Sequence, residues 1–134
     1  MARLTHPYRR TITGVGAVTA AGGYVGTWQL VTGVATPSGA DLPPGLDSWV
    51  LPGLWLCATV AVPWTIAAWL TWRRSDRAPA AVLVAAATLA IELAVQIPFV
   101  GFNALQVVFG AVAVVLGGMA LEARRAWAPG GSRP

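Results

Sequence analysis

Hydrophobic residues fill most of the chain in four long stretches, which are separated by short segments rich in proline, glycine or arginine. The stretches cover roughly residues 11–33, 49–72, 78–99 and 102–121. At about 1.5 Å per residue in a helix, each is long enough to cross a hydrocarbon core of about 30 Å. Glu92 is the one charged residue within them. The pattern predicts four membrane-spanning segments.

Each predicted segment must be a helix, because lipid offers no partner for backbone N–H and C=O groups and the segments lack the alternation of a membrane barrel. We therefore expect an all-α fold, a four-transmembrane-helix bundle. Inside the second segment, Pro63 predicts a kink. Breaker residues lie where connections are needed: Pro37, Gly39, Pro43, Pro44 and Gly45 after the first helix, Ser75 with Pro79 after the second, and Pro98 with Gly101 after the third.

The composition agrees with a membrane protein. Of the 134 residues, 56% are hydrophobic and 10% are charged, whereas about 25% are charged in soluble domains. The basic residues lie in three short clusters between apolar stretches and not on one solvated face, so nucleic-acid binding is not expected. The single cysteine, Cys57, cannot form an intrachain disulfide.

The arginines predict the orientation of the chain. All nine basic residues precede the first helix, lie between the second and third, or follow the fourth: Arg3, Arg9, Arg10, Arg73, Arg74, Arg77, Arg124, Arg125 and Arg133. With four crossings these segments share one side, and the connections on the other side carry only Asp41 and Asp47. The positive-inside rule therefore places both termini in the cytoplasm of a bacterial cell, with the protein in the inner membrane.

This topology divides the chain into three parts. Residues 1–10 form a cytoplasmic tail, residues 11–121 the transmembrane domain, and residues 122–134 a second cytoplasmic tail. A cleaved signal peptide is the alternative for the first stretch, but the stretch is too long and too rich in glycine for one. Aromatic and basic residues at the ends of the helices are expected to anchor them at the interfaces: Trp28, Trp49, Trp69, Trp72, Trp127, Arg73, Arg74, Arg124 and Arg125.

Polar residues within the helices converge at one depth. Glu92 lies fourteen residues after Ala78, so its carboxyl is about 21 Å along a crossing of about 30 Å. The same counting brings further polar and aromatic residues to this level from other helices. We expect an outward-facing polar pocket formed by Glu92, Gln96, Gln29, Asn103, Gln106 and Trp55.

Three interpretations of Glu92 are open. An unpaired charge in a membrane helix costs at least about 2.5–3.5 kcal/mol, so such a residue is retained for a reason. A neutral carboxyl hydrogen-bonded to Gln96 or Gln106 would simply hold helices together. Alternatively, Glu92 is a proton or cation site, or it contacts a lipid headgroup or a partner subunit.

Catalysis has little support in the sequence. The only histidine, His6, lies in the N-terminal tail, on the side opposite Glu92. No nucleophile is placed to pair with a histidine base, and no spacing typical of metal ligands is present. We therefore expect no enzymatic activity, no metal and no cofactor.

Small residues four apart predict close packing of the helices. The pairs are Gly22 with Gly26, Ala86 with Ala90, Ala90 with Ala94, and Ala113 with Gly117. Contacts within one bundle are the simplest interpretation, and a homo-oligomer interface is the alternative.

Short motifs also resemble a family of small uncharacterised bacterial membrane proteins with four helices. They are Gly22-Gly23 through Gln29, Pro37-Ser38-Gly39, Leu51-Pro52-Gly53, Gln96, and Leu105-Gln106 with Gly110. The resemblance covers about residues 20–120. It implies the four-helix topology and no particular activity, and Glu92 is not carried over from it.

Three classes of function remain at this point. We expect a non-enzymatic membrane protein, an accessory subunit or scaffold whose outer pocket holds a lipid headgroup, a small ligand or a partner helix. Its partners would be the lipid bilayer and a second copy of the chain or another membrane protein. A small proton- or cation-coupled transporter using Glu92 is the alternative, and a lipid-directed enzyme is the third.

Overall fold

A computed structural model of the chain describes residues 6–34, 42, 44–100 and 104–125, and all of its regular structure within these ranges is helical. Four helical rods follow one another. The first is α1 (His6–Thr32), and the second joins α2 (Val50–Leu56), the π-helical turn η2 (Cys57–Ala61) and α3 (Val62–Trp72). The third and fourth are α4 (Ala78–Val100) and α5 (Ala104–Arg125). The prediction of an all-α fold with four helices is confirmed.

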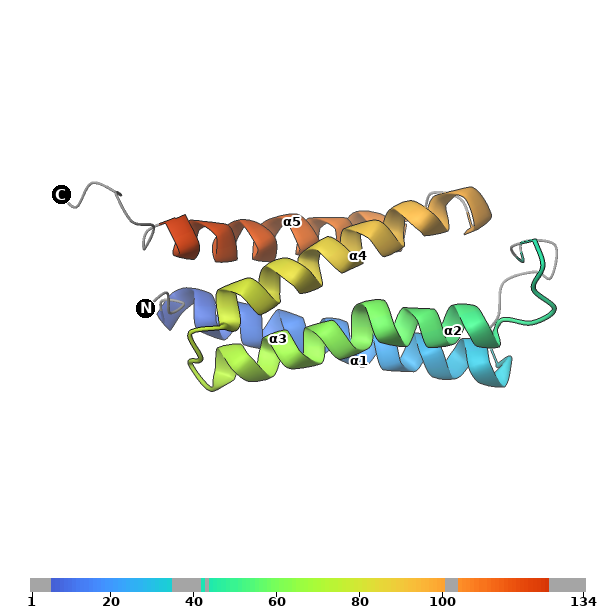
Figure 1. The fold of residues 1–134 in the computed structure, drawn as a ribbon, viewed down its shortest axis with the longest axis horizontal. Helices are drawn as coiled ribbons and strands as arrows, with labels where there is room; N and C mark the ends of the chain where they lie inside the picture. Colours follow the sequence, from blue (N-terminus) through green and yellow to red (C-terminus); the bar gives the residue numbers. More distant parts are fainter. Residues whose placement is uncertain (1–5, 35–41, 43, 101–103, 126–134) are drawn as a thin grey trace.

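The rods are arranged as two antiparallel hairpins (Figure 1). One hairpin pairs α1 with the rod from α2 to α3, and the other pairs α4 with α5. The two are joined mainly by the packing of α3 and η2 against α4, whereas α1 and α5 meet over a small area. As a result, the bundle is less tightly closed between α1 and α5 than elsewhere.

Within the first hairpin, glycine lets the helices approach closely. A Cβ atom on Gly23 would lie 3.0 Å from the backbone nitrogen of Ala61, and one on Gly53 would lie 3.3 Å from the carbonyl oxygen of Thr27. Neither neighbour can move aside, because both atoms belong to the backbone of a helix. These two glycines therefore set the distance between α1 and the second rod.

The buried apolar core fills mainly the half of the bundle that contains the start of α4 and the end of α5. Its members on α4 run from Val82 to Leu89 and those on α5 from Ala113 to Ala120. Trp64, which is fully buried, is its largest side chain. Beyond Leu89 the core gives way to polar side chains, and this is where the candidate site lies.

The outer surface of the bundle is strongly apolar. Val18, Val114 and Leu105 expose two thirds or more of their surface. Three rods, at residues 50–72, 78–98 and 104–125, are long and apolar enough to cross a membrane. The 27 residues of α1 provide the length but less apolarity. An apolar exterior around three such helices indicates a membrane protein.

Several helix ends differ from the predicted ones. The first helix begins at His6, five residues before the predicted start, and α5 ends at Arg125, four residues after the predicted end. The predicted bounds marked the apolar stretch, whereas arginine is a good helix former and continues the helix beyond it. The third helix was predicted over residues 78–99, and α4 runs one residue further, to Val100; Pro98, which was assigned with Gly101 to the connection, lies within the last turn of α4. Most of the predicted connection after α1 lies outside the described residues.

Candidate functional site

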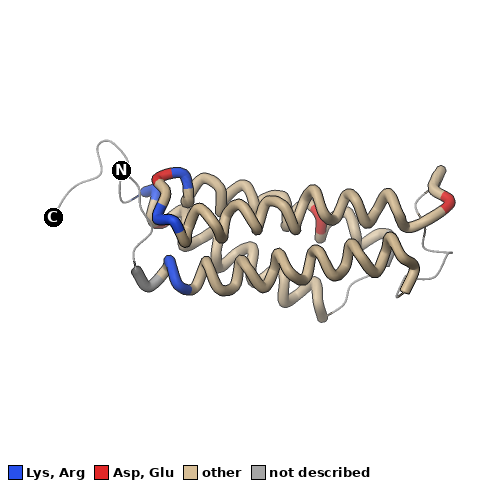
Figure 2. Tube along the Cα trace, turned by 90° about the horizontal axis from the view of Figure 1, so that it is seen from below, with Lys and Arg blue, Asp and Glu red and all other residues tan. Residues whose placement is uncertain are grey.

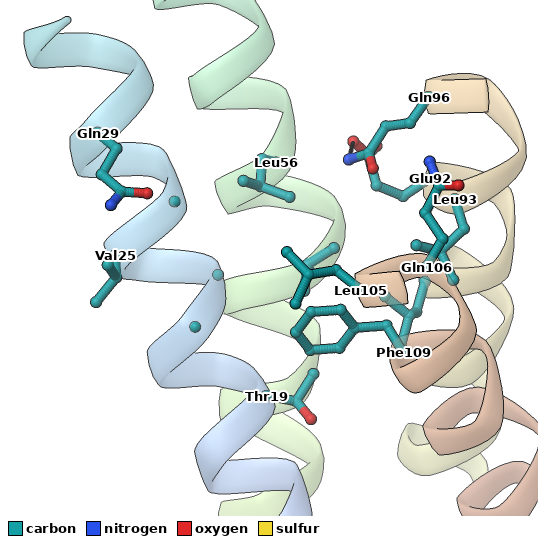
Figure 3. Close-up of a pocket in the computed structure, with 15 residues that line it drawn as sticks. Thr19, Val25, Gln29, Leu56, Glu92, Leu93, Gln96, Leu105, Gln106 and Phe109 are labelled. Carbon is teal, nitrogen blue, oxygen red and sulfur yellow. Dashed lines mark hydrogen bonds between the residues drawn. The ribbon is translucent and has the colours of Figure 1, made fainter. Parts of the chain in front are cut away.

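A partly open cavity of about 350 Å³ lies between the two hairpins. Every rod contributes to its lining, with α1 and α2–η2 on one side and α4 and α5 on the other (Figure 3). The lining residues are Thr19, Gly22, Gly23, Val25, Gly26, Gln29, Leu56, Val60, Leu89, Glu92, Leu93, Gln96, Leu105, Gln106 and Phe109. The volume is within the range of small-molecule sites, about 300–1,000 Å³.

Glu92 is the charged group of this lining and is almost fully buried, with 5% of its surface exposed. Its two carboxyl oxygens have different neighbours. The side-chain amide of Gln96, one helical turn further along α4, donates a hydrogen bond to Oε1 at 2.8 Å. The hydroxyl of Thr59, from η2 in the opposite hairpin, lies 3.2 Å from Oε2. Both neighbours are neutral, so they orient the carboxyl without balancing a charge on it.

Thr59 is positioned by the π-helical turn. The N–H of Val62 donates to the carbonyl oxygen of Cys57, five residues earlier, which is the π pattern. Pro63 follows directly, and its ring has no N–H and would clash with the carbonyl of Thr59 in a regular α-helix. The wider π turn relieves this conflict. It also places Thr59 beside α4. The kink of the whole rod that Pro63 predicts is not tested by this local geometry and stays a prediction.

The Thr59 hydroxyl can serve either charge state of Glu92. Its oxygen lies 2.8 Å from the carbonyl oxygen of Trp55 as well as 3.2 Å from Glu92 Oε2. A hydroxyl carries only one proton. A protonated Glu92 would donate to Thr59, which in turn donates to Trp55, whereas an ionised Glu92 must share the Thr59 proton with that carbonyl. The geometry therefore allows both forms of the carboxyl.

Two further glutamines line the cavity. Gln106 from α5 is buried, with 6% of its surface exposed, and Gln29 from α1 is half-buried. Figure 3 shows Gln29 on the α1 side of the cavity, with Glu92 and Gln96 on the far side. Amide groups can donate and accept hydrogen bonds. The cavity thus presents polar groups from three helices at one level.

The structure brings together four of the six residues predicted for the pocket: Glu92, Gln96, Gln29 and Gln106. Asn103 lies outside the described residues. Trp55 is half exposed, at 51%, and is not among the described residues that line the cavity. It contributes its backbone carbonyl, which accepts from Thr59.

Sequence reasoning missed Thr59 and the apolar part of the lining. Leu105 and Phe109 from α5 face the cavity alongside the polar groups (Figure 3), and Val25 from α1 is a further apolar residue of the lining. The available signal for Thr59 was its position four residues before Pro63, which marks a carbonyl that loses its helical donor. The apolar residues of the lining could not be recognised from the sequence, because leucine and phenylalanine are equally common facing lipid.

The opposite end of the bundle holds the described arginines (Figure 2). We call it the arginine-rich end; it comprises Arg9, Arg10, Arg73, Arg74, Arg77, Arg124 and Arg125. Arg9 lies over the Trp72 ring at 5.9 Å and donates to the Trp72 carbonyl at 3.2 Å. Arg73 lies 5.4 Å from the centre of the Trp69 ring. The predicted interface residues Trp69, Trp72 and Arg73 thus take part in cation–π pairs, one of them with Arg9.

A hydrogen bond joins α1 to α5 at the arginine-rich end. The hydroxyl of Tyr8 donates to Glu122 Oε2 at 2.8 Å. This bond, together with the negative charge of Glu122, raises the pKa of the Tyr8 hydroxyl above its ordinary value of 10.0. The bond closes the bundle at the end away from the cavity.

Other predicted interface residues are also described. Trp28 is more than half exposed near the end of α1, and Trp49 is half-buried just before α2. Arg74 follows α3 and is exposed, as are Arg124 and Arg125 at the end of α5. Trp127 lies outside the described residues.

The polar groups of the cavity can form hydrogen bonds with a molecule placed between the hairpins. They are one carboxyl, three amides and one hydroxyl of Thr19, with Thr59 behind the carboxyl. The Thr19 hydroxyl already donates to the carbonyl of Val15 at 2.8 Å. Within the described part of the chain, no group of three potential metal ligands is present. Such a lining can accept cations and hydrogen-bond donors.

Comparisons of the chain with protein-family models, with curated proteins and with solved structures find no significant match. The resemblance to small four-helix bacterial membrane proteins therefore stays a prediction.

Proposed function

We propose that this chain is a non-enzymatic integral membrane protein, an accessory subunit or scaffold that binds a ligand in the cavity around Glu92. The cavity carries the proposal, because it joins a buried carboxyl and three glutamines to an apolar wall, beside a core cluster that is apolar throughout. Lipids, small ligands and partner helices are the classes of occupant that can present polar groups to Glu92 and the glutamines and apolar groups to the rest of the lining.

We propose further that α1 also crosses the membrane, although it is less apolar than the other rods. Three of its threonines direct their hydroxyls back to helix carbonyls: Thr19 to Val15, Thr27 to Gly23 and Thr32 to Trp28, at 2.7–2.8 Å. These bonds satisfy three hydroxyls within the helix, which lowers the cost of placing them in lipid. Four crossings then put both ends of the bundle's chain on one side.

In the orientation that we propose, the arginine-rich end faces the cytoplasm of a bacterial cell and the cavity faces outward from the inner membrane. The positive-inside rule supports this orientation, since the described arginines gather at one end (Figure 2). The cavity would then be reached from the outer leaflet or from the space outside the membrane.

A small proton- or cation-coupled transporter is the second candidate. The position of Thr59 favours it, because a hydroxyl between Glu92 and the Trp55 carbonyl can accommodate a carboxyl with or without its proton. A coupled carrier needs a group of this kind. Transport of a solute against a proton gradient in proteoliposomes, abolished by Glu92→Gln, would favour the transporter over the accessory protein.

Native mass spectrometry of the full chain, purified in mild detergent, tests the proposed binding function. A Cβ atom on Gly22 would face Phe109 across the cavity, 3.8 Å from its ring, whereas one on Gly14 would meet nothing within 4 Å. We therefore expect Gly22→Leu to fill the cavity and Gly14→Leu to serve as its matched control. The proposal predicts a co-purifying adduct of defined mass in the wild type and in Gly14→Leu that Gly22→Leu loses. An adduct that persists in Gly22→Leu, or no adduct in any form, would overturn it.

A further inference from the structure

We propose that the cavity selects a lipophilic amine: a molecule with a cationic ammonium head that pairs with Glu92 and a short apolar body that lies against Phe109 and Leu105. This inference rests on the proposed binding function and specifies the class of ligand. It follows from the charge, the shape and the opening of the cavity.

The carboxyl of Glu92 favours a cationic ligand in the cavity. Glu92 is nearly fully buried, and its two described hydrogen-bond neighbours, Gln96 and Thr59, are neutral. The arginine nearest to it in the sequence is Arg77, which directly precedes α4, fifteen residues before Glu92 and therefore about 22 Å away along the helix axis. An ionised carboxyl without a cation is costly at this depth. A bound ammonium would supply the missing charge.

The polar groups of the cavity also fit an ammonium better than an anion. An ammonium group has three N–H donors and no acceptor. Glu92, Gln29 and Gln106 line one space from three helices, and each of these side chains contains an oxygen that accepts hydrogen bonds. A phosphate-bearing headgroup would instead meet a carboxyl and no described basic side chain in the lining, which disfavours it.

The rest of the lining fits an apolar body. Leu93 and Leu89 continue the cavity from Glu92 along α4, and Leu105 and Phe109 face it from α5 (Figure 3). A polar ion without an apolar part would leave this wall uncovered. Burial of apolar surface contributes about 25 cal/mol per Å², so a ligand that has both parts uses the whole lining.

The opening of the cavity allows such a ligand to enter from lipid. The small contact between α1 and α5 includes the approach of Gly22 to Phe109 and the bond between Tyr8 and Glu122. Gly22 has no side chain, and Leu105 is two-thirds exposed, so the edge between these helices is thinly covered on the cavity side. An amphiphile in the membrane can pass there with its head leading toward Glu92.

The test compares three probes that share an eight-carbon chain: octylamine, 1-octanol and octanoate. Binding to the full chain in phosphatidylcholine nanodiscs is measured by calorimetry, with empty nanodiscs subtracted. We expect octylamine to bind at least about tenfold more tightly than 1-octanol, and octanoate to bind most weakly. In Glu92→Gln the preference for octylamine over 1-octanol should disappear. In Asp47→Asn, which removes an exposed carboxyl at the same end of the bundle, the preference should be unchanged.

The outcomes separate the inference from the proposed function. If 1-octanol binds as tightly as octylamine and Gly22→Leu abolishes both, the cavity is a binding site but the selection of a cation is refuted. A preference for octylamine that survives Glu92→Gln would also refute it. If no probe binds the wild type more than Gly22→Leu, and no co-purifying adduct depends on Gly22, the proposed function fails as well.

Discussion

The carboxyl of Glu92 is held by groups from both hairpins, and this shared support makes it sensitive to small changes. Gln96 reaches it from the same helix and Thr59 from η2. Hydrogen bonds to a buried carboxyl are worth more than average because few alternatives exist when one is removed. The Thr59 bond therefore contributes both to the orientation of Glu92 and to the contact between the hairpins.

Thr59→Val removes the hydroxyl and nearly preserves the shape of the side chain. We expect a loss of about 1–3 kcal/mol in the free energy of unfolding, because Glu92 Oε2 loses a donor in a buried position. Denaturant unfolding in detergent micelles measures the loss. Thr88→Val is the control, since the Thr88 hydroxyl donates to the carbonyl of Ala85 within α4. Equal losses in the two variants would show that the contact with Glu92 carries no weight.

The Tyr8 bond predicts a dependence on alkaline pH. Because its folded-state pKa is raised above 10.0, neutral Tyr8 stabilises the folded state fully below pH 10. The contribution is lost as the pH rises through the folded-state pKa. We expect the wild type to melt at a slightly higher temperature than Tyr8→Phe below pH 10 and the difference to vanish above it. A difference that stays constant across this range would contradict the role of the bond.

At the scale of elements, the crossing of α1 with the second rod depends on glycine. A Cβ atom on Gly23 would lie so close to the backbone of Ala61 that one of the two helices would have to shift. Leu56 and Val60, which line the cavity, are carried by the same rod. The position of one wall of the cavity thus follows from this crossing.

Gly23→Ala should destabilise the bundle by about 1–3 kcal/mol, as overpacking usually does. Gly14→Ala, on the same helix with open space around it, should be neutral or slightly stabilising because alanine is the better helix former by about 1 kcal/mol. Unfolding of both variants in the same detergent provides the comparison. Stabilisation by Gly23→Ala would mean that the two helices do not approach as described.

The sequence was informative where a single helix decides the outcome. Glu92 and Gln96 are four residues apart, so their shared face and their contact were predictable. Counting residues from the helix ends also brought Gln29 and Gln106 to the level of Glu92. The contact of Thr59 with Glu92 was not predictable, because it depends on a π turn and on which face of the second rod meets α4.

Helix ends were predictable only as the limits of apolar stretches. His6 to Arg10 and Glu122 to Arg125 are polar but remain helical, since the hydrogen bonds of a helix do not stop where the lipid does. Similarly, Pro98 was assigned with Gly101 to the connection after the third helix, but it lies within α4, where it is exposed. The hydropathy pattern therefore predicts which residues lie in lipid, whereas the backbone hydrogen bonds determine where a helix begins and ends.

At the scale of the whole molecule, the bundle has an apolar exterior, an arginine-rich end and a polar cavity toward the other end. This combination underlies the proposed topology. Asp47 and Asp76 are exposed and lie in different connections, with Asp76 among the arginines and Asp47 just before α2. In the proposed topology, the two positions therefore lie on opposite sides of the membrane.

Single-cysteine variants test this topology. In a Cys57→Ala background, we expect Asp47→Cys to react with a membrane-impermeant maleimide added to intact spheroplasts and Asp76→Cys to react only after lysis. Reaction of Asp76→Cys alone in intact spheroplasts would show that the orientation is opposite to the proposed one. Reaction of both variants in intact spheroplasts would place the two positions on the same side, so the rod between them would not cross the membrane.

The measurement that tests the central claim most directly is infrared difference spectroscopy of the Glu92 carboxyl, identified by subtraction of Glu92→Gln. If the cavity is a ligand site, octylamine should shift the Glu92 carboxyl signal in the wild type and leave it unchanged in Gly22→Leu, whose cavity is filled. A Glu92 signal that is the same with and without octylamine, 1-octanol and octanoate would contradict the account, because Glu92 would then serve only to hold the two hairpins together.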